Sequence, residues 1–207
     1  ETRETNQRRF TRDDGVIVVA TVAFGMGIDK PDVRFVAHLD MPQSVEHFYQ
    51  ESGRAGRDGL PAASWLCYGL NDWVILRERI QQGASEEMQK NIELQKLDAM
   101  LGVCETADCR RVMLLQHFGE TSAPCGHCDN CLHPPVRFDG TVLVQKLLSC
   151  VYRVGQRFAA GYVINVLRGK GDDWMARNGH DKLSTFGIGD ALGDKEWRGV
   201  IRQCIGL

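Results

Sequence analysis

The sequence predicts an α/β fold with a parallel sheet in its N-terminal part, followed by a region made of helices alone. Three short apolar segments within residues 1–70 are predicted as strands, and helical segments separate or follow them. Strands that alternate with helices indicate a parallel sheet, because parallel neighbours need a crossover connection. From residue 83 onward only helical segments are predicted, two before a cysteine cluster and three after it.

The predicted strands are Val16–Ala20, Arg34–Leu39 and Ala63–Tyr68. The first is apolar throughout, as expected for a strand that is buried on both faces of a sheet. Ser44 is placed to cap a helix that starts at Val45, because its hydroxyl can accept from the N–H groups of the first turn. These features describe a sheet whose strands are connected by helices.

Helices and boundaries follow from periodicity and from the Pro, Gly and polar segments. A polar linker at residues 81–85 and the pair Pro134-Pro135 divide the chain into residues 1–82, 83–135 and 136–207. A polar helix is expected at residues 1–12. The further predicted helices cover residues 72–80, 86–104, 108–118, 142–154, 160–168 and 195–205.

Composition excludes some classes of protein and leaves others open. The net charge is −2, but residues 137–207 carry 11 Lys and Arg against 7 Asp and Glu, which suits contact with a polyanion or simply a solvated basic face. The sequence has no signal peptide and no apolar run of about 18 residues, so we expect a cytoplasmic protein without a membrane partner. Glu1 opens a helix without an initiating Met and Leu207 ends one, so we expect a fragment.

The most informative segment is Gln50–Gly59, in which two arginines lie three residues apart and each follows a glycine. Arg54 and Arg57 are always charged and can bind phosphate oxygens with two parallel hydrogen bonds. Glycine allows close approach of the backbone to a ligand and a positive φ. A second glycine-rich turn spans Ala23–Lys30. Together the two segments indicate nucleoside-triphosphate chemistry.

Four of the eight cysteines form a pattern typical of a metal site. Cys109, Cys125, Cys128 and Cys131 have the spacing C-x15-C-x2-C-x2-C, and four thiolates suit a closed, structural Zn²⁺ site. The alternatives are a redox pair or unliganded core cysteines. Other candidate ligands lie nearby, and these are Cys104, His117, His127 and His133. The remaining cysteines, Cys67, Cys150 and Cys204, have apolar neighbours and are predicted to be core residues.

These features resemble the RecQ family of superfamily 2 helicases. Val19–Pro31 resembles motif V and Gln50–Arg57 resembles motif VI, and the cysteine cluster follows in the order that the family has. Residues 158–163, 179–183 and 197–204 resemble its C-terminal winged helix. The resemblance implies the C-terminal part of a second RecA-like lobe over residues 1–82, a helical zinc-binding module over 83–135, and a truncated winged-helix domain over 136–207 without its wing.

The resemblance also implies roles for residues at an ATP site. Arg54 and Arg57 would contact the γ-phosphate, where an arginine finger neutralises developing charge. Gln50 would organise the site, Asp29 would lie near the ribose hydroxyls, and Gly27 would lie against the nucleotide. Alternatively, Arg54 and Arg57 are two exposed side chains at the end of a helix that bind no ligand.

Four residues are candidates for DNA contact. Thr21 resembles a motif V position that touches phosphates, although it could simply end a strand. Asp40 follows a strand at the carboxyl edge, where open parallel sheets bind ligands, or it could cap a turn. Arg198 and Arg202 lie four residues apart on an outward helix face and could bind phosphates, or they could be ordinary surface residues.

The family resemblance implies an ATP-dependent helicase that moves 3′ to 5′ on DNA in recombination, repair, replication and the SOS response, as a nucleoid-associated bacterial monomer. DNA and single-strand-binding protein would be its partners, and Zn²⁺, ATP and Mg²⁺ its ligands. The chain contains no G-x-x-x-x-G-K-[ST] loop or acidic Mg²⁺ motif, so we expect no ATP hydrolysis by this segment alone. The alternatives are a non-catalytic DNA-binding adaptor and an RNA-directed ATPase.

Overall fold

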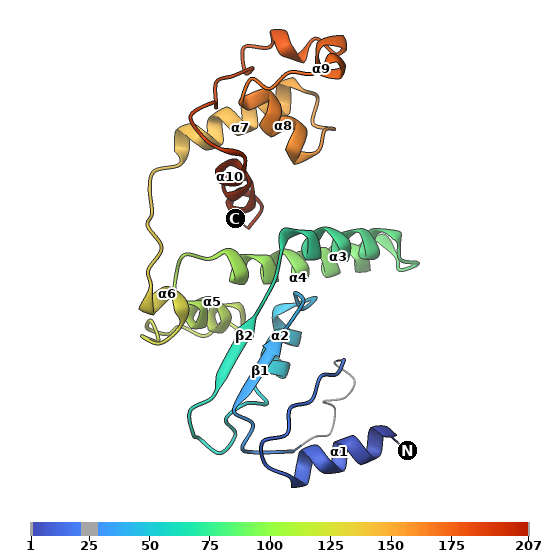
Figure 1. Ribbon diagram of the computed structural model, residues 1–207, viewed down its shortest axis with the longest axis vertical. Helices are drawn as coiled ribbons and strands as arrows, with labels where there is room; N and C mark the ends of the chain where they lie inside the picture. The colour runs from blue at the N-terminus through green and yellow to red at the C-terminus, as the bar shows by residue number, and fades with distance from the viewer. Residues whose placement is uncertain (1, 22–28, 207) are drawn as a thin grey trace. The chain divides into compact units, whose positions relative to one another are not determined.

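A computed structural model describes residues 2–21 and 29–206 of the chain (Figure 1). The chain divides into two compact units. The first contains Glu1–Val103 together with Gln116–Glu120, and the second contains Cys104–Leu115 together with Thr121–Leu207. Among the described helices, none is long and apolar enough to cross a membrane.

The first unit is built around a two-stranded parallel sheet. Strands β1 (Phe35–His38) and β2 (Ala63–Leu66) pair in register from Phe35 opposite Ala63 to His38 opposite Leu66. Helix α2 (Val45–Ser52) makes the crossover between them, and helix α1 (Thr2–Arg12) precedes the sheet. The predicted α/β arrangement with a parallel sheet is confirmed for these two strands.

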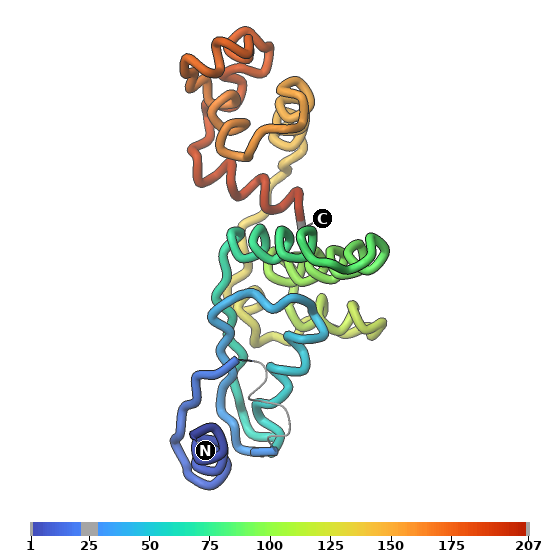
Figure 2. Tube along the Cα trace, turned by 90° about the vertical axis from the view of Figure 1, so that its right-hand side faces the viewer, coloured from blue at the N-terminus to red at the C-terminus, as the bar shows by residue number. Residues whose placement is uncertain are grey.

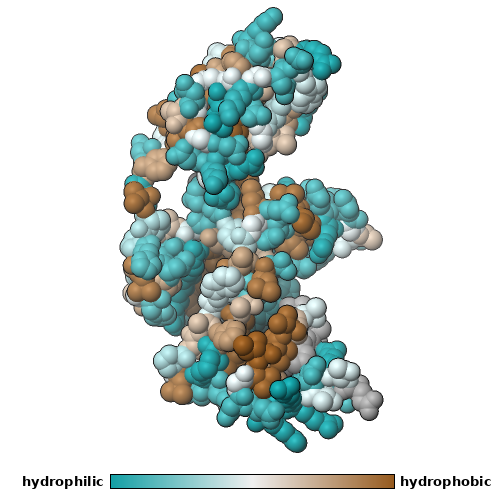
Figure 3. Space-filling model, in the orientation of Figure 1, coloured by the Kyte–Doolittle hydropathy of each residue, from teal (hydrophilic) through white to brown (hydrophobic). Residues whose placement is uncertain are grey.

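The prediction of a buried strand at Val16–Ala20 is wrong. These residues have no regular secondary structure, and Ile17 and Val19 are 71% and 86% exposed. Figure 3 shows apolar side chains gathered at the surface in the lower part of that view, and Ile17 and Val19 are among the exposed large apolar residues. A strand exists only where a neighbour satisfies its backbone N–H and C=O groups, and the described sheet consists of β1 and β2. An apolar run predicts burial, but it does not show that a neighbouring strand is available to form backbone hydrogen bonds with it.

Helix α2 begins where the sequence predicts. The Ser44 hydroxyl accepts a hydrogen bond from the backbone N–H of His47 at 3.2 Å, and Val45 is fully buried. Glu46 is also held in this first turn. A hydrogen bond from Ser44, aided by His117 and Lys96, outweighs desolvation and lowers the pKa of Glu46 to about 2. The start of α2 is therefore tied to two residues that lie far from it in the sequence of the first unit, Lys96 and His117.

Two long helices follow the sheet as a hairpin, and the two views show them side by side (Figures 1 and 2). These are α3 (Leu70–Gln82) and α4 (Glu87–Glu105). The indole N–H of Trp73 donates to Asp98 at 2.9 Å, and Arg77 lies over the same indole ring. Two short helices carry or adjoin the cysteine cluster: α5 (Arg110–His117) begins directly after Cys109, and α6 (Asp129–Leu132) contains Cys131.

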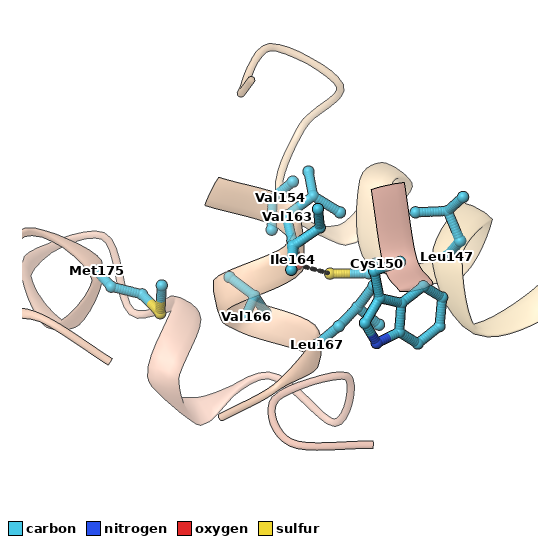
Figure 4. Close-up of a cluster of buried hydrophobic side chains, with 9 residues drawn as sticks. Leu147, Cys150, Val154, Val163, Ile164, Val166, Leu167 and Met175 are labelled. Atoms are coloured by element: carbon cyan, nitrogen blue, oxygen red, sulfur yellow. Dashed lines mark hydrogen bonds between the residues drawn. The ribbon is translucent and has the colours of Figure 1, made fainter. Parts of the chain in front are cut away.

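The rest of the second unit is a helical cluster with its own core (Figure 4). It contains α7 (Thr141–Arg153), α8 (Ala160–Leu167), α9 (Asp173–Arg177), the 3₁₀ turn η2 (His180–Lys182) and α10 (Asp194–Gly206). The sequence predicts α7, α8 and α10 but not the short α9. Trp197 of α10 is fully buried, so its role as a core residue is confirmed.

The other apolar positions of α10 behave similarly. Val200, Ile201 and Cys204 are partly buried against the same core, and Cys150 of α7 is fully buried with its thiol directed at the Val163 carbonyl. The prediction that Cys67 is a core residue is wrong, because it is exposed directly after β2.

The contact between Gly189 and Trp197 yields a test of this core. The carbonyl of Gly189 accepts from the Trp197 indole N–H at 2.8 Å, and an added Cβ at position 189 would lie 2.5 Å from the ring. We expect Gly189→Ala to lower the free energy of unfolding by about 1–3 kcal/mol, because the fully buried Trp197 ring has no space into which it could move away from the added methyl group. Urea denaturation measures the effect. Gly199→Ala is the matched control, since its Cβ would meet only an Arg202 nitrogen at 3.9 Å, and equal loss in both variants would contradict this account.

Candidate functional site

The two predicted phosphate-binding arginines lie on a tight turn directly after α2, which we call the arginine turn (Gly53–Asp58). Gly56 adopts φ +70°, and a Cβ there would approach Ala62 and the Leu60 carbonyl at 3.0 and 3.1 Å. Gly53 has φ −67°, so positive φ is not the reason for glycine at this position. A Cβ on Gly53 would instead lie 2.9 Å from the Tyr49 carbonyl oxygen, so both glycines are required by close backbone contacts.

Backbone hydrogen bonds attach the arginine turn to the segment that leads into β1. The N–H of Gly56 donates to the Val33 carbonyl at 2.9 Å, and the N–H of Asp58 donates to the Pro31 carbonyl at 3.2 Å. The side chains of Arg34 and Asp58 add an ion pair at 2.6 Å. The hydrogen bond from Arg34 is the main cause that lowers the pKa of Asp58. The arginine turn is thus fastened to residues 31–34, which lead into β1.

Two residues predicted for the nucleotide meet in the structure. The guanidinium of Arg57 contacts the carboxylate of Asp29 at 3.1 Å, and both side chains are exposed, at 41% and 89%. Arg54 is half-buried on the same turn, and Gln50 is exposed on α2. Gly27 lies outside the described residues. Asp29 and Arg57, separated by 28 positions in the sequence, therefore share one accessible surface.

The first two candidate DNA contacts, Thr21 and Asp40, are exposed. Asp40 lies in a bend two residues beyond the carboxyl end of β1, as predicted. The arginine turn lies at the other end of the same strand, beside Val33 and Arg34. The structure therefore separates Asp40 from the arginines by the length of β1.

The other two candidate DNA contacts are engaged with carboxylates on or near α10. Arg198 pairs with Asp194 one turn earlier at 2.7 Å. Arg202 pairs with Glu105 at 3.2 Å, and its neighbour Gln203 donates to the same residue. Either arginine would have to exchange a carboxylate for a phosphate in order to bind DNA.

The four candidate metal ligands come together. Their sulfur atoms all lie within 4.8 Å of one another, and those of Cys109 and Cys128 are 3.9 Å apart. A tetrahedral zinc site with Zn–S distances of about 2.3 Å requires sulfurs separated by about 3.8 Å. Gly126 adopts φ +76° in the turn between Cys125 and Cys128. The cluster therefore fits a single tetrahedral ion.

Hydrogen bonds prepare the sulfurs for ionisation. The N–H of Cys125 donates to the sulfur of Cys109 at 3.2 Å, and the N–H of Cys128 donates to the sulfur of Cys125 at 3.3 Å. Desolvation opposes ionisation of Cys109, but its hydrogen bonds outweigh it and lower the pKa to about 6. At Cys131 the bond with Gly126 favours the thiolate, yet the neighbouring cysteines prevail and raise the pKa to about 12. Only a bound cation would let all four thiolates coexist.

Polar contacts around the cysteines brace the two segments that carry them. Arg110, directly after Cys109, binds both carboxylate oxygens of Asp129 at 2.7 and 2.8 Å. The Asn130 amide donates to the carbonyls of Thr106 and Asp108. The competing candidate Cys104 lies outside the cluster, where burial raises its pKa to about 12. Another competitor, His117, contacts Glu46 instead.

Three family models match consecutive parts of the chain. They are a helicase conserved C-terminal domain over residues 1–59, a RecQ zinc-binding domain over residues 70–132 and an RQC domain over residues 134–207. Together they follow the order of the arginine turn, the cysteine cluster and the C-terminal helices.

Curated relatives match across the same length. The chain is 50% identical to an ATP-dependent DNA helicase RecQ of Haemophilus influenzae, over 99% of this chain and 33% of the relative. It is 42% identical to the protein of that name from Bacillus subtilis, over 91% and 32%. A RecQ-like DNA helicase of Caenorhabditis elegans is 33% identical, over 98% and 22%. The chain thus spans about a third or less of the length of these relatives.

The cysteine cluster predicts one zinc ion per chain, measurable by elemental analysis. Cys128→Ser should lose the ion and expose residues 105–135 to protease, because metal binding supplies much of the folding energy of a small module. Cys67→Ser is the matched control, since Cys67 is exposed and lies outside the cluster. A metal-free protein whose cysteine segment still resists protease would refute the assignment, as would a Cys125–Cys128 disulfide under reducing conditions.

Proposed function

The chain belongs to the RecQ family of helicases, and from this premise we propose that it supplies the arginine-bearing half of the ATP site in a DNA helicase. The observation that carries the proposal is the convergence of Asp29 with Arg57 on an exposed turn that is fastened to the sheet. The relatives' names connect such chains with ATP and DNA. The longer polypeptide would provide the rest of the site, including the residues that hold Mg²⁺ and the β- and γ-phosphates.

The proposed roles follow from charge and position. Arg54 and Arg57 would bind the γ-phosphate oxygens and neutralise the charge that develops on them during transfer. Arg57 would leave the Asp29 carboxylate for the phosphate, which frees Asp29 to accept hydrogen bonds from the ribose hydroxyls. Gln50, exposed on α2 just before the turn, would orient the attacking water or the arginines, and Gly27 would lie against the nucleotide.

The remaining proposals concern DNA and metal. Thr21, Asp40, Arg198 and Arg202 are the candidate DNA contacts, and Zn²⁺ bound to the four cysteines would be structural. We propose a division into a RecA-like part at 1–82, a zinc-binding module at 83–135 and winged-helix residues at 136–207. The full protein would move 3′ to 5′ as a monomer during recombination, repair, replication and the SOS response, with single-strand-binding protein as a partner, in the cytoplasm at the nucleoid.

The arginine finger is tested in the full-length enzyme. Arg57→Ala should leave the affinities for ATP and DNA within a few fold and lower kcat by roughly 10³ or more, because it removes charge stabilisation needed only in the transition state. Steady-state ATPase assays with DNA provide the measurement. Arg9→Ala, which removes an exposed arginine of α1, is the control. A loss smaller than about tenfold would contradict the finger role.

DNA binding by the present chain is tested by its salt dependence. We expect weak binding and no ATP hydrolysis, and changing both Arg198 and Arg202 to Ala should flatten the plot of log affinity against log salt by about two units. Labelled duplex with a single-stranded overhang is titrated at several salt concentrations. Arg9→Ala removes a comparable i,i+4 ion pair and should leave the slope unchanged. An unchanged slope in the double variant would move the DNA surface elsewhere, for example to Thr21.

A further inference from the structure

Two side-chain contacts, a hydrogen bond and an ion pair, lie at the two ends of the arginine turn. At its start, the Nε2 atom of His38 in β1 lies 2.7 Å from a carboxylate oxygen of Glu51, in the last turn of α2. The two side chains are only 10% and 18% exposed, and the ring of Phe48 packs 5.2 Å from the imidazole. This pair joins the sheet to α2 three residues before Arg54.

At the end of the turn, Arg34 forms an ion pair with Asp58, the residue that follows Arg57. One guanidinium nitrogen contacts the Asp58 carboxylate at 2.6 Å, and the others donate to the carbonyls of Asp32 and Pro61 at 2.9 and 3.1 Å. The second carboxylate oxygen of Asp58 accepts from the Leu60 N–H. Arg34 therefore connects the chain before β1 with the chain on the far side of the arginine turn.

We propose that His38 and Arg34 are positioning residues for the arginine turn, acting through Glu51 and Asp58. The inference rests on the proposed function, in which Arg54 and Arg57 meet a γ-phosphate. An arginine contributes to catalysis only when its guanidinium is held in the correct position against the γ-phosphate, since a displacement of about 1 Å can lower the rate roughly 10²-fold. The two contacts connect the end of α2 and the end of the arginine turn to β1 and to the residue before it.

Stability alone does not account for the two pairs. The Arg34–Asp58 pair is 41% and 23% exposed, and ion pairs of this kind contribute little to folding. His38 is nearly buried and its Nδ1 atom finds no partner among the described residues, so a pair of apolar side chains at positions 38 and 51 would fold as well. A positional role explains why charged and polar groups occupy both places.

The test is a double-mutant cycle in the full-length enzyme. His38→Leu and Arg34→Ala should each lower kcat by about 10- to 100-fold with KM for ATP and the affinity for DNA changed much less. In an Arg57→Ala background either change should cause at most a threefold further loss, because the group being positioned is gone. His38→Gln, which keeps a donor near the Nε2 position, should restore most of the activity lost in His38→Leu.

Controls separate this role from general destabilisation. Arg77→Ala removes an ion pair with Asp98 in the same unit and should leave kcat unchanged. Thermal melts of all variants show whether a loss of kcat is explained by unfolding. Arg34→Lys, which keeps the positive charge, is included as a more conservative variant. Equal losses in the wild-type and Arg57→Ala backgrounds, or full activity of both single variants, would overturn the positioning role. If Arg57→Ala itself keeps full turnover, the proposed function fails first, and that result is distinct from either of these.

Discussion

The parallel pairing of β1 with β2 is the constraint on which the rest of the first unit depends. A parallel neighbour can be reached only by returning the chain to the edge where the first strand began, and α2 makes that return. The residues between the end of α2 and the start of β2 must therefore lie beside the residues that precede β1. The arginine turn is the segment found there, and Gly56 pairs with Val33 for this reason.

This geometry gives the two edges of the sheet different chemistry. Arginines, a carboxylate and tight glycines gather at the amino edge, whereas Asp40 lies beyond the carboxyl edge. The two strands and α2 connect the two edges of the sheet. His38 and Glu51 lie on that route, since they join β1 to the last turn of the helix.

The second unit is held together by polar contacts around the cysteines and by a separate apolar core. Its cysteine segment has little apolar burial, and polar bonds from Arg110 and Asn130 join the two halves that carry the sulfurs. The C-terminal helices instead bury a continuous apolar cluster around Trp197 and Leu167. One region thus combines a cluster of metal-binding residues with polar contacts, and the other is held by close apolar packing.

Sequence by itself determined the features that depend on residues close together in the chain. The Ser44 cap, the parallel α/β pattern, the gathering of four cysteines and the helical periodicity of α7, α8 and α10 all follow from short-range spacing. The same reasoning failed at Val16–Ala20, because an apolar run carries no information about whether a pairing edge exists beside it.

Only the tertiary structure decided which charged and polar side chains meet. His38 finds Glu51 across 13 positions, Arg34 finds Asp58 across 24, and Gln203 reaches Glu105 across 98. No local pattern marks these partners, because an ion pair depends on the distance between two side chains after the backbone has been placed. The same limit applies to Arg202, which the structure pairs with Glu105, whereas the pairing of Arg198 with Asp194 is an i,i+4 contact that helix spacing alone could have predicted.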